Sequence, residues 1–345
     1  MITFNGMAIG LVIAGVLVAG PAAAQKKFYK LGSFPPGTTP YIVNTAFANA
    51  VNKHVADTEI QISATGPATQ HMLLVTEGKM DFAMSAPTAY RLMYKQIGPF
   101  KRLKDGKTRV RKMPMLFSYP IGAYHFVTYA SSGIKSLSDL KGKSVFLGPP
   151  GGVATRNVTL IVEAMTGLKP RKDFKQIRMG WGAAAQAFQD RKFDVWVPVT
   201  NAPSPQVQQI ALSNKIRILG LDKAKFDRPA WKKYWNQPGR RMVSIAPGTY
   251  GKNQVNTEEA LTTGAFVGMV ARHDIPEETI YQMVKAFWEN IADAHAMAKW
   301  AKTALTPELA VAAIAGDLHP GAAKYYREKG MKISVIYDPD KGIGK

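Results

Sequence analysis

Short apolar, strand-like runs alternate with helix-like segments in the first part of the chain. The strand-like runs cover residues 28–32, 60–64 and 81–85. Between them, residues 41–55 carry apolar side chains at helical spacing, and residues 68–77 form a second helix-like segment. Loops that contain Gly, Pro and Thr separate the segments. Because strands that alternate with helices favour parallel pairing, the pattern predicts α/β layers.

The same alternation starts again further along the chain. A strand at residues 144–147 leads through a glycine-rich loop into a helix that reaches about residue 165, and another strand covers residues 193–199. A later helix is expected to begin at Pro276 and to run to about Trp300. Residues 101–113 are strongly basic and are expected to form a solvated loop.

Two longer apolar runs, residues 119–130 and 265–271, are typical of extended strands that join two α/β units. The chain is therefore predicted to form a two-lobed α/β fold. Each lobe is a mostly parallel sheet flanked by helices, and a ligand cleft lies between the lobes. We expect lobe 1 to contain residues 25–127 and 255–345, and lobe 2 to contain residues 128–254.

The N-terminus has the form of an export signal. An apolar run over residues 7–19 is followed by Gly20-Pro21 and three alanines. It is shorter than the roughly 20 apolar residues that a membrane-spanning helix needs, and an apolar run that ends in Ala-x-Ala is typical of a cleaved signal peptide. We expect residues 1–24 to be removed near Ala24-Gln25, which makes the mature protein periplasmic. A retained anchor and a buried helix are the alternatives.

Composition excludes several kinds of chemistry. The 345 residues include no cysteine, so thiolate catalysis, disulfides and Cys-ligated zinc are excluded. The six histidines show no metal-ligand spacing, and no pattern of a nucleophile with a base, or of paired carboxylates, stands out. We therefore expect neither an enzyme nor a metal site nor a cofactor.

The charge is strongly positive. Lys and Arg number 45 against 24 Asp and Glu, which gives a formal net charge of +21. The basic residues form scattered clusters without a nucleic-acid-binding motif, and export would separate the protein from nucleic acid. A positive field would instead raise the association rate of anionic ligands, or favour anionic lipid surfaces.

One glycine-rich loop is the strongest candidate for a binding element. It follows a strand, opens a helix and has the sequence Gly148-Pro149-Pro150-Gly151-Gly152-Val153-Ala154-Thr155. Backbone N–H groups that converge at a helix N-terminus hold carboxylates and phosphates. The loop lacks the glycine spacing and the Gly-Lys-Ser/Thr of nucleotide-binding loops. The alternative is an ordinary strand-to-helix turn, since Gly and Pro favour turns for local reasons.

Three other loops follow strands in equivalent positions and offer hydroxyls, an amide or backbone N–H groups. Their sequences are Gly37-Thr38-Thr39, Thr65-Gly66-Pro67 and Thr200-Asn201. Ligands of open α/β sheets bind at the carboxyl ends of the strands, where such loops converge. Together the four loops predict the binding of a small polar anion.

At this level of detail the chain resembles a known family, the TAXI-type extracytoplasmic solute receptors of TRAP transporters. The resemblance extends from about Phe28 to Met331. It rests on the ordered segments GTTPYIVNTAFANAVNKH, SATGPATQHMLLVTEGKMDFAM, SSGIKSLSDLKGKSVFLGPPGG, NAPSPQVQQIA, APGTYGKNQ, IPEETIYQMVKAFWEN and LHPGAAKYYREKG.

The resemblance implies a type-II periplasmic-binding-protein fold that closes over one small organic acid, such as glutamate or 2-oxoglutarate, and delivers it to a TRAP-type membrane permease. The chain would work as a monomer. Carried over by position, the ligand contacts would be Thr39, Tyr41, Thr65, Gly66, Ser85, Gly151, Gly152, Val153, Ala154, Thr155, Asn201 and Tyr250, to which we add Thr88 and Arg156.

Two of these positions need comment. Ala86-Pro87-Thr88 stands where the family often has a polar triplet. An amino group on the ligand would need an acidic partner, which Thr88 does not supply, so we expect a carboxylate without an α-amino group. Arg156 could pair with that carboxylate, or it could be a solvated residue of the first helical turn, where a cation opposes the helix dipole.

Three other functions remain open at this stage. The same fold would serve a sensory module that presents its ligand to a membrane signalling partner, or an ABC-type binding protein. A neighbouring gene for a multi-span permease, rather than for a histidine kinase, would favour transport over sensing. An exported hydrolase or lyase is the third alternative, and turnover of a bound organic acid would favour it.

Overall fold

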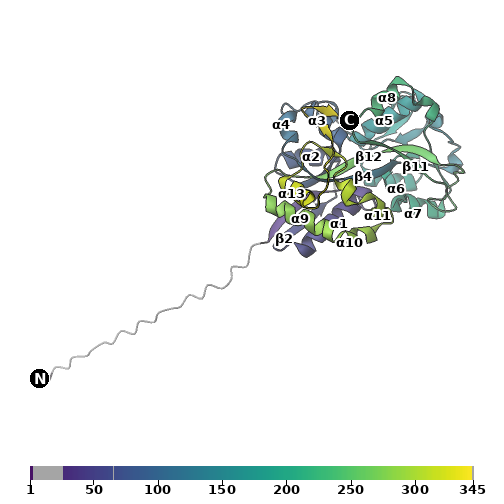
Figure 1. The fold of residues 1–345 in the computed structure, drawn as a ribbon. Helices are drawn as coiled ribbons and strands as arrows, with labels where there is room; N and C mark the ends of the chain where they lie inside the picture. The colour runs from purple at the N-terminus through teal and green to yellow at the C-terminus, as the bar shows by residue number, and fades with distance from the viewer. Residues whose placement is uncertain (3–25, 65, 344–345) are drawn as a thin grey trace.

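The computed structural model describes residues 1–2, 26–64 and 66–343 (Figure 1). Most of the predicted signal peptide and its cleavage position lie outside the described residues. In the described part of the chain, no helix has both the length and the apolar character needed to cross a membrane.

A seven-stranded mixed sheet forms one half of the molecule. β1 runs parallel to β2 and β3, whereas β12 is antiparallel to β3, β4 and β11. In spatial order its strands are β2 (Thr58–Ser63), β1 (Lys27–Gly32), β3 (Phe82–Ser85), β12 (Ala260–Ala271), β4 (Met115–Tyr124) and β9 (Val199–Thr200), with β11 (Arg240–Ile245) also paired to β12. The helices of this half are α1 (Thr39–His54), α2 (Ala68–Thr76), α3 (Pro87–Tyr94), α4 (Gly106–Val110), α9 (Glu277–Glu289), α10 (Ile291–Met297), α11 (Ala301–Ala304), α12 (Pro307–Ala310) and α13 (Pro320–Glu328).

A five-stranded mixed sheet forms the other half. β6 is parallel to β7 and β8, and β5 is antiparallel to β8 and β10. Its order is β10 (Ile216–Leu219), β5 (Phe126–Tyr129), β8 (Val195–Trp196), β6 (Ser144–Phe146) and β7 (Lys175–Ile177). The helices here are α5 (Val153–Thr166), α6 (Trp181–Gln189), α7 (Pro205–Ser213) and α8 (Pro229–Trp235). A small third sheet contains β13 (Ile314–Ala315), β14 (Val335–Asp338) and β15 (Gly342–Ile343).

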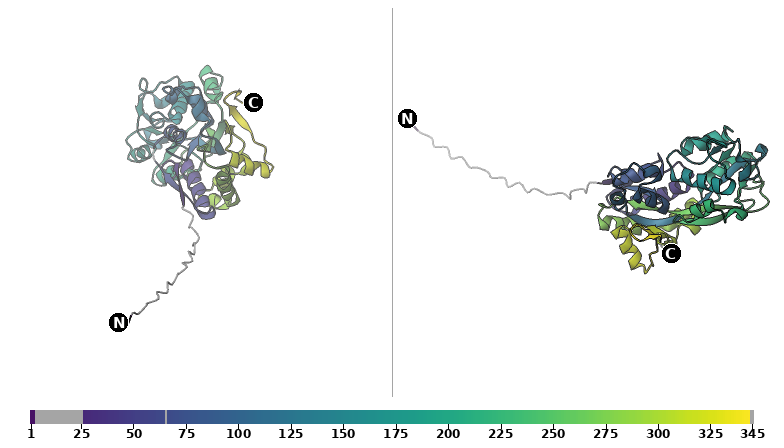
Figure 2. Two further views of the ribbon diagram at one scale, coloured as in Figure 1. Left: turned by 90° about the vertical axis from the view of Figure 1, so that its left-hand side faces the viewer. Right: turned by 90° about the horizontal axis from the view of Figure 1, so that it is seen from above.

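The predicted two-lobed α/β architecture is thus confirmed, with one difference in the sheets. Parallel pairing holds for β1, β2 and β3 and for β6, β7 and β8, but the long strands that join the halves add antiparallel pairs. The right-hand view of Figure 2 shows the N-terminal helices and the segment of residues 150–235 on opposite sides of the molecule. The exact lobe boundaries stay a prediction.

Three expected elements are divided in the structure. The run at residues 119–130 forms β4 and β5, which belong to different sheets and are separated only by His125. The run at residues 193–199 likewise contains β8 of the five-stranded sheet and leads into β9 of the seven-stranded sheet. The helix expected to reach Trp300 is interrupted at Asn290, whose side-chain amide donates to the backbone oxygen of Ala286. The basic segment at residues 101–113 contains the short helix α4.

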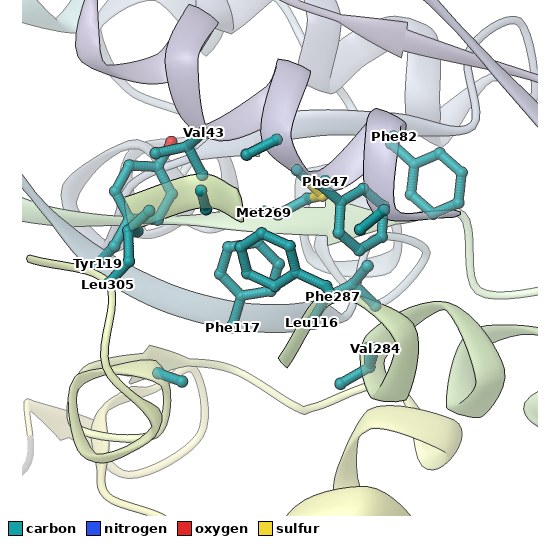
Figure 3. Close-up of a cluster of buried hydrophobic side chains, with 14 of the residues drawn as sticks. Val43, Phe47, Phe82, Leu116, Phe117, Tyr119, Met269, Val284, Phe287 and Leu305 are labelled. Carbon is teal, nitrogen blue, oxygen red and sulfur yellow. The ribbon is translucent and has the colours of Figure 1, made fainter. Parts of the chain in front are cut away.

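An aromatic cluster forms the core of the first half (Figure 3). Phe117 of β4 and Phe287 of α9 are stacked, with ring centroids 5.1 Å apart, and Phe47 of α1 contacts both rings. All ten residues of β4 are buried. Side chains of α1 and α9 pack on one part of the strand, and those of α3 belong to the cluster around its first residue, Met115. Close packing of this core fixes the position of the loops that follow the strands of the first sheet.

Candidate functional site

A cleft between the two sheets is the candidate site. Its empty space is about 990 Å³, part of it open to solvent. Both halves contribute side chains, and most of the lining is apolar. The bulky apolar residues that line it are Phe34, Met84, Ile121, Val153, Trp181, Trp196, Val199 and Val267. The polar ones are Thr38, Thr88, Tyr124, Asn157, Thr200, Gln206 and Arg240.

The two tryptophans form an aromatic wall from the second half. Trp181 begins α6, and its ring meets that of Phe146 edge-on at 5.5 Å. Trp196 of β8 is only 1% exposed, and its indole N–H has no hydrogen-bond partner among the described residues. Large aromatic faces of this kind contribute apolar contact to a ligand, and the indole N–H adds one donor.

The glycine-rich loop places the N-terminus of α5 at the cleft. Gly152 is the N-cap residue and has no side-chain capping bond, and the Thr155 hydroxyl donates instead to the Pro149 oxygen at 2.6 Å. The backbone N–H groups of Val153, Ala154 and Thr155 form no hydrogen bond with another described residue. Gly152, Val153 and Ala154 line the cleft. Free donors at a helix N-terminus favour an anionic group there.

A hydroxyl pair beside the cleft joins the start of α1 to β9. Thr39 is fully buried, its Oγ1 lies 3.3 Å from Oγ1 of Thr200, and it accepts the backbone N–H of Asn201 at 2.8 Å. The Asn201 side-chain amide donates to the Pro120 oxygen at 3.0 Å. Thr39 and Asn201 therefore hold the base of the cleft in place through their own hydrogen bonds.

Other predicted contacts lie farther from the lining. Tyr250 is buried, and its hydroxyl lies 2.6 Å from Nε2 of His125 and accepts the N–H of Ser204 at 3.2 Å. The Ser85 hydroxyl faces the Met72 sulfur at 3.7 Å. Gly66 and Gly151 are exposed, Tyr41 and Thr155 are half-buried, and Thr65 lies outside the described residues. Of the predicted set, the structure brings four residues into the lining: Thr88, Gly152, Val153 and Ala154.

A hydrogen-bonded chain from Arg240 crosses the cleft, and sequence reasoning did not find it. Arg240 Nη2 donates to Oδ1 of Asn157 at 2.7 Å, and Asn157 Nδ2 donates to the Tyr124 hydroxyl at 3.0 Å. The guanidinium of Arg240 also lies over the Tyr234 ring, 4.5 Å from its centroid. The only hint in the sequence is the place of this arginine in the basic cluster at residues 223–241.

Electrostatically, the cleft is positive. Among the described residues, no Asp, Glu, His or Lys lines it, and Arg240 is its one charged lining residue. Arg156, beside Asn157 on α5, has its pKa lowered by burial and, to a smaller degree, by the positive charges of Arg240 and Arg91. In the part of the chain that the structure describes, no cluster of three His, Asp or Glu side chains could bind a metal ion.

The fold and the cleft define a two-lobed α/β protein with one binding cleft between its lobes. The chain belongs to the NMT1-like family, whose model matches residues 31–330.

Solved structures of solute-binding proteins show a distant likeness. The alkanesulfonate-binding protein SsuA from Xanthomonas axonopodis pv. citri, bound to MOPS, is 12% identical, with 82% of each chain covered and a TM-score of 0.46. DctP7, a Bordetella pertussis extracytoplasmic solute receptor binding pyroglutamic acid, is 10% identical, with 90% of this chain and 87% of that chain covered and a TM-score of 0.46. A TRAP periplasmic solute-binding protein from Sulfitobacter sp. NAS-14.1 with bound β-D-galacturonate is 11% identical, with 90% and 89% covered and a TM-score of 0.46. At these values the likenesses assign no ligand to this chain.

Proposed function

We propose that this protein is a periplasmic solute receptor that captures a small organic anion in the inter-lobe cleft and delivers it to the membrane permease of a TAXI-type TRAP transporter. The observation that carries the proposal is the composition of the cleft. Its lining includes Arg240 and the open amides of α5, and no described acidic side chain. An anion is therefore the ligand whose charge this site stabilises.

The cleft favours binding over turnover. Its described hydroxyls belong to Thr38, Thr88, Thr200 and Tyr124, and no described histidine, carboxylate or lysine lines it as a general base. A hydroxyl needs such a base to become a nucleophile. The buried His125 is hydrogen-bonded to Tyr250 behind the cleft and is held neutral by burial, which lowers its pKa to about 4.

We propose that some of the predicted residues contact the ligand directly and that the others act indirectly. Val153 and Ala154 present free backbone donors, and Gly152 and Thr88 lie in the lining, so we propose these four residues as direct contacts. The other predicted contacts are proposed to act in cleft closure or through the base of the cleft. The absence of a described acidic lining residue also supports a ligand without an α-amino group.

The experiment is a thermal-shift screen of the chain from Gln25 onward against dicarboxylates, keto acids, aromatic acids, sulfonates and amino acids. A ligand at 100 times its dissociation constant stabilises the folded state by about 2.7 kcal/mol. Ala154→Trp, which fills the cleft at the start of α5, is the control and should abolish the shift. If no anion shifts the melting temperature, or if the bound acid is chemically converted, the proposed function is wrong.

A further inference from the structure

Three arginines from separate elements gather beside the cleft: Arg91 of α3, Arg156 of α5 and Arg240 of β11. Arg156 lies one helical turn after Val153, which lines the cleft, so the two residues share a helix face. Its Cδ lies 3.9 Å from the position that a Cβ on Gly98 would occupy. Arg156 therefore reaches from the second half of the molecule to the first.

The charges of these arginines are not neutralised within the described chain. None of the three forms a salt bridge with a described residue, although other arginines of the protein do. The hydrogen-bond partners of two of them are neutral: Arg91 donates to Oε1 of Gln237 at 3.0 Å, and Arg240 donates to Asn157. Since guanidinium groups stay protonated, like charges face one another beside the cleft.

Several hydrogen-bond donors at this place are unused. Nη1 of Arg156 and Nε of Arg240 are buried and have no hydrogen-bond partner among the described residues. The Tyr124 hydroxyl accepts from Asn157, which leaves its own proton to donate. Buried donors without acceptors are costly, and a carboxylate or sulfonate supplies the acceptor oxygens that a guanidinium prefers.

We propose that Arg156 and Arg240, supported by Arg91, anchor the oxyanion head group of the ligand, and that the ligand is an amphipathic organic acid with an apolar body. This inference rests on the proposed function and specifies its ligand class. The apolar body would lie against Phe34, Trp181 and Trp196. Sugar acids and amino acids fit these walls poorly, because their hydroxyl or ammonium groups would lose water without gaining partners.

Calorimetric titration with four small probes tests the ligand class. Benzoate and benzenesulfonate carry the two candidate oxyanions on one apolar body, benzamide is the neutral counterpart, and gluconate is a hydrophilic acid. We expect at least one of the two aromatic acids to bind, and benzamide and gluconate to bind at least tenfold more weakly. A wild-type protein that binds gluconate or benzamide as tightly as benzoate overturns the proposed class.

Charge-removing variants test the anchor. Arg156→Gln and Arg240→Gln are expected to weaken the aromatic acid at least tenfold and to change benzamide binding less than twofold. Arg241→Gln is the matched control, because this neighbour on β11 lies over the Phe266 ring, 5.0 Å from its centroid, and it should bind like the wild type. Without ligand, Arg156→Gln should melt no lower than the wild type, since the substitution removes a buried charge that faces like charges.

The outcomes separate the two proposals. If the wild type binds aromatic acids but both glutamine variants bind them equally well, the anchor is wrong and the receptor function stands. If only hydrophilic acids or amino acids bind, the ligand class is wrong and the receptor function again stands. If neither these probes nor any acid of the wider screen binds, the proposed function itself fails.

Discussion

Arg240 Nη2 donates to Oδ1 of Asn157 at 2.7 Å, and this bond joins β11 of the seven-stranded sheet to α5 of the other half of the molecule. Asn157 Nδ2 in turn donates to the Tyr124 hydroxyl at 3.0 Å. One buried amide therefore orients both a cation and a hydroxyl of the cleft.

Replacing Asn157 should expose this role. Asn157→Leu has a similar volume but removes both hydrogen bonds and leaves the guanidinium without its acceptor. Because buried polar groups that lose a partner cost about 1–3 kcal/mol each, we expect the free energy of unfolding in urea to fall by about 2 kcal/mol. An unchanged midpoint and slope of the urea transition would show that the connection contributes no stability.

The glycine-rich loop offers a second test, at Gly148. This residue has φ +126°, and a Cβ there would lie 2.7 Å from Oγ1 and 3.0 Å from N of Thr155. Gly148→Ala should therefore displace the start of α5, lower the melting temperature and weaken ligand binding.

Gly142→Ala is the matched control for this test. Gly142 also has positive φ, at +74°, but nothing lies within 4 Å of its added Cβ, so it should cost only the backbone strain of about 1–2 kcal/mol and leave ligand affinity unchanged. Equal losses in the two variants would contradict the crowding argument.

The sequence could predict local elements well, because apolar periodicity is a local signal. The helix expected at residues 41–55 is α1 at Thr39–His54, and the helix expected at residues 68–77 is α2 at Ala68–Thr76. Periodicity does not show which sheet a strand joins. For this reason a single apolar run at residues 119–130 conceals the crossing from β4 to β5 at His125.

The candidate site was less predictable for the same reason. The loop at Gly152 could be recognised, since its glycines and its helix are adjacent in the chain. The pairing of Arg240 with Asn157 joins residues 83 positions apart and depends on how β11 adds to the edge of β12. Nor does any local pattern show that Trp181 and Trp196 line the same cleft.

Protonation of buried histidine predicts an acid-sensitive fold. Burial lowers the pKa of His125 to about 4, against about 6.5 in the unfolded chain. Between these values the unfolded state binds more protons, so stability is fully present above pH 6.5 and is lost as the pH falls toward 4. The pKa of His319 is likewise lowered to about 4, mainly by burial.

Urea titrations from pH 7 to pH 4.5 measure this effect. His125→Gln should reduce the pH slope of the unfolding free energy by about 1.4 kcal/mol per pH unit. His54→Gln, at an exposed position on α1, should leave the slope unchanged. If the slope is the same in all three proteins, His125 titrates normally in the folded state.

Closure of the cleft should depend on two hydrogen bonds at or next to its lining. Gln206 Nε2 of α7 donates to the Pro36 oxygen at 2.9 Å, and the Thr69 hydroxyl of α2 donates to the Gly151 oxygen at 3.4 Å. Each bond connects one half of the molecule to the other. Gln206→Ala should therefore favour the open form and weaken ligand binding about fivefold, since a neutral hydrogen bond contributes about 1 kcal/mol net.

Stopped-flow kinetics with the ligand found in the screen separates this effect from a lost contact. Because the bond holds the closed form together, Gln206→Ala should accelerate dissociation and leave association nearly unchanged. Gln208→Ala, at an exposed position two residues along α7, is the control and should change neither rate. A slower association with normal dissociation would instead mean that Gln206 guides the ligand into the cleft, and that its bond to Pro36 does not hold the lobes together.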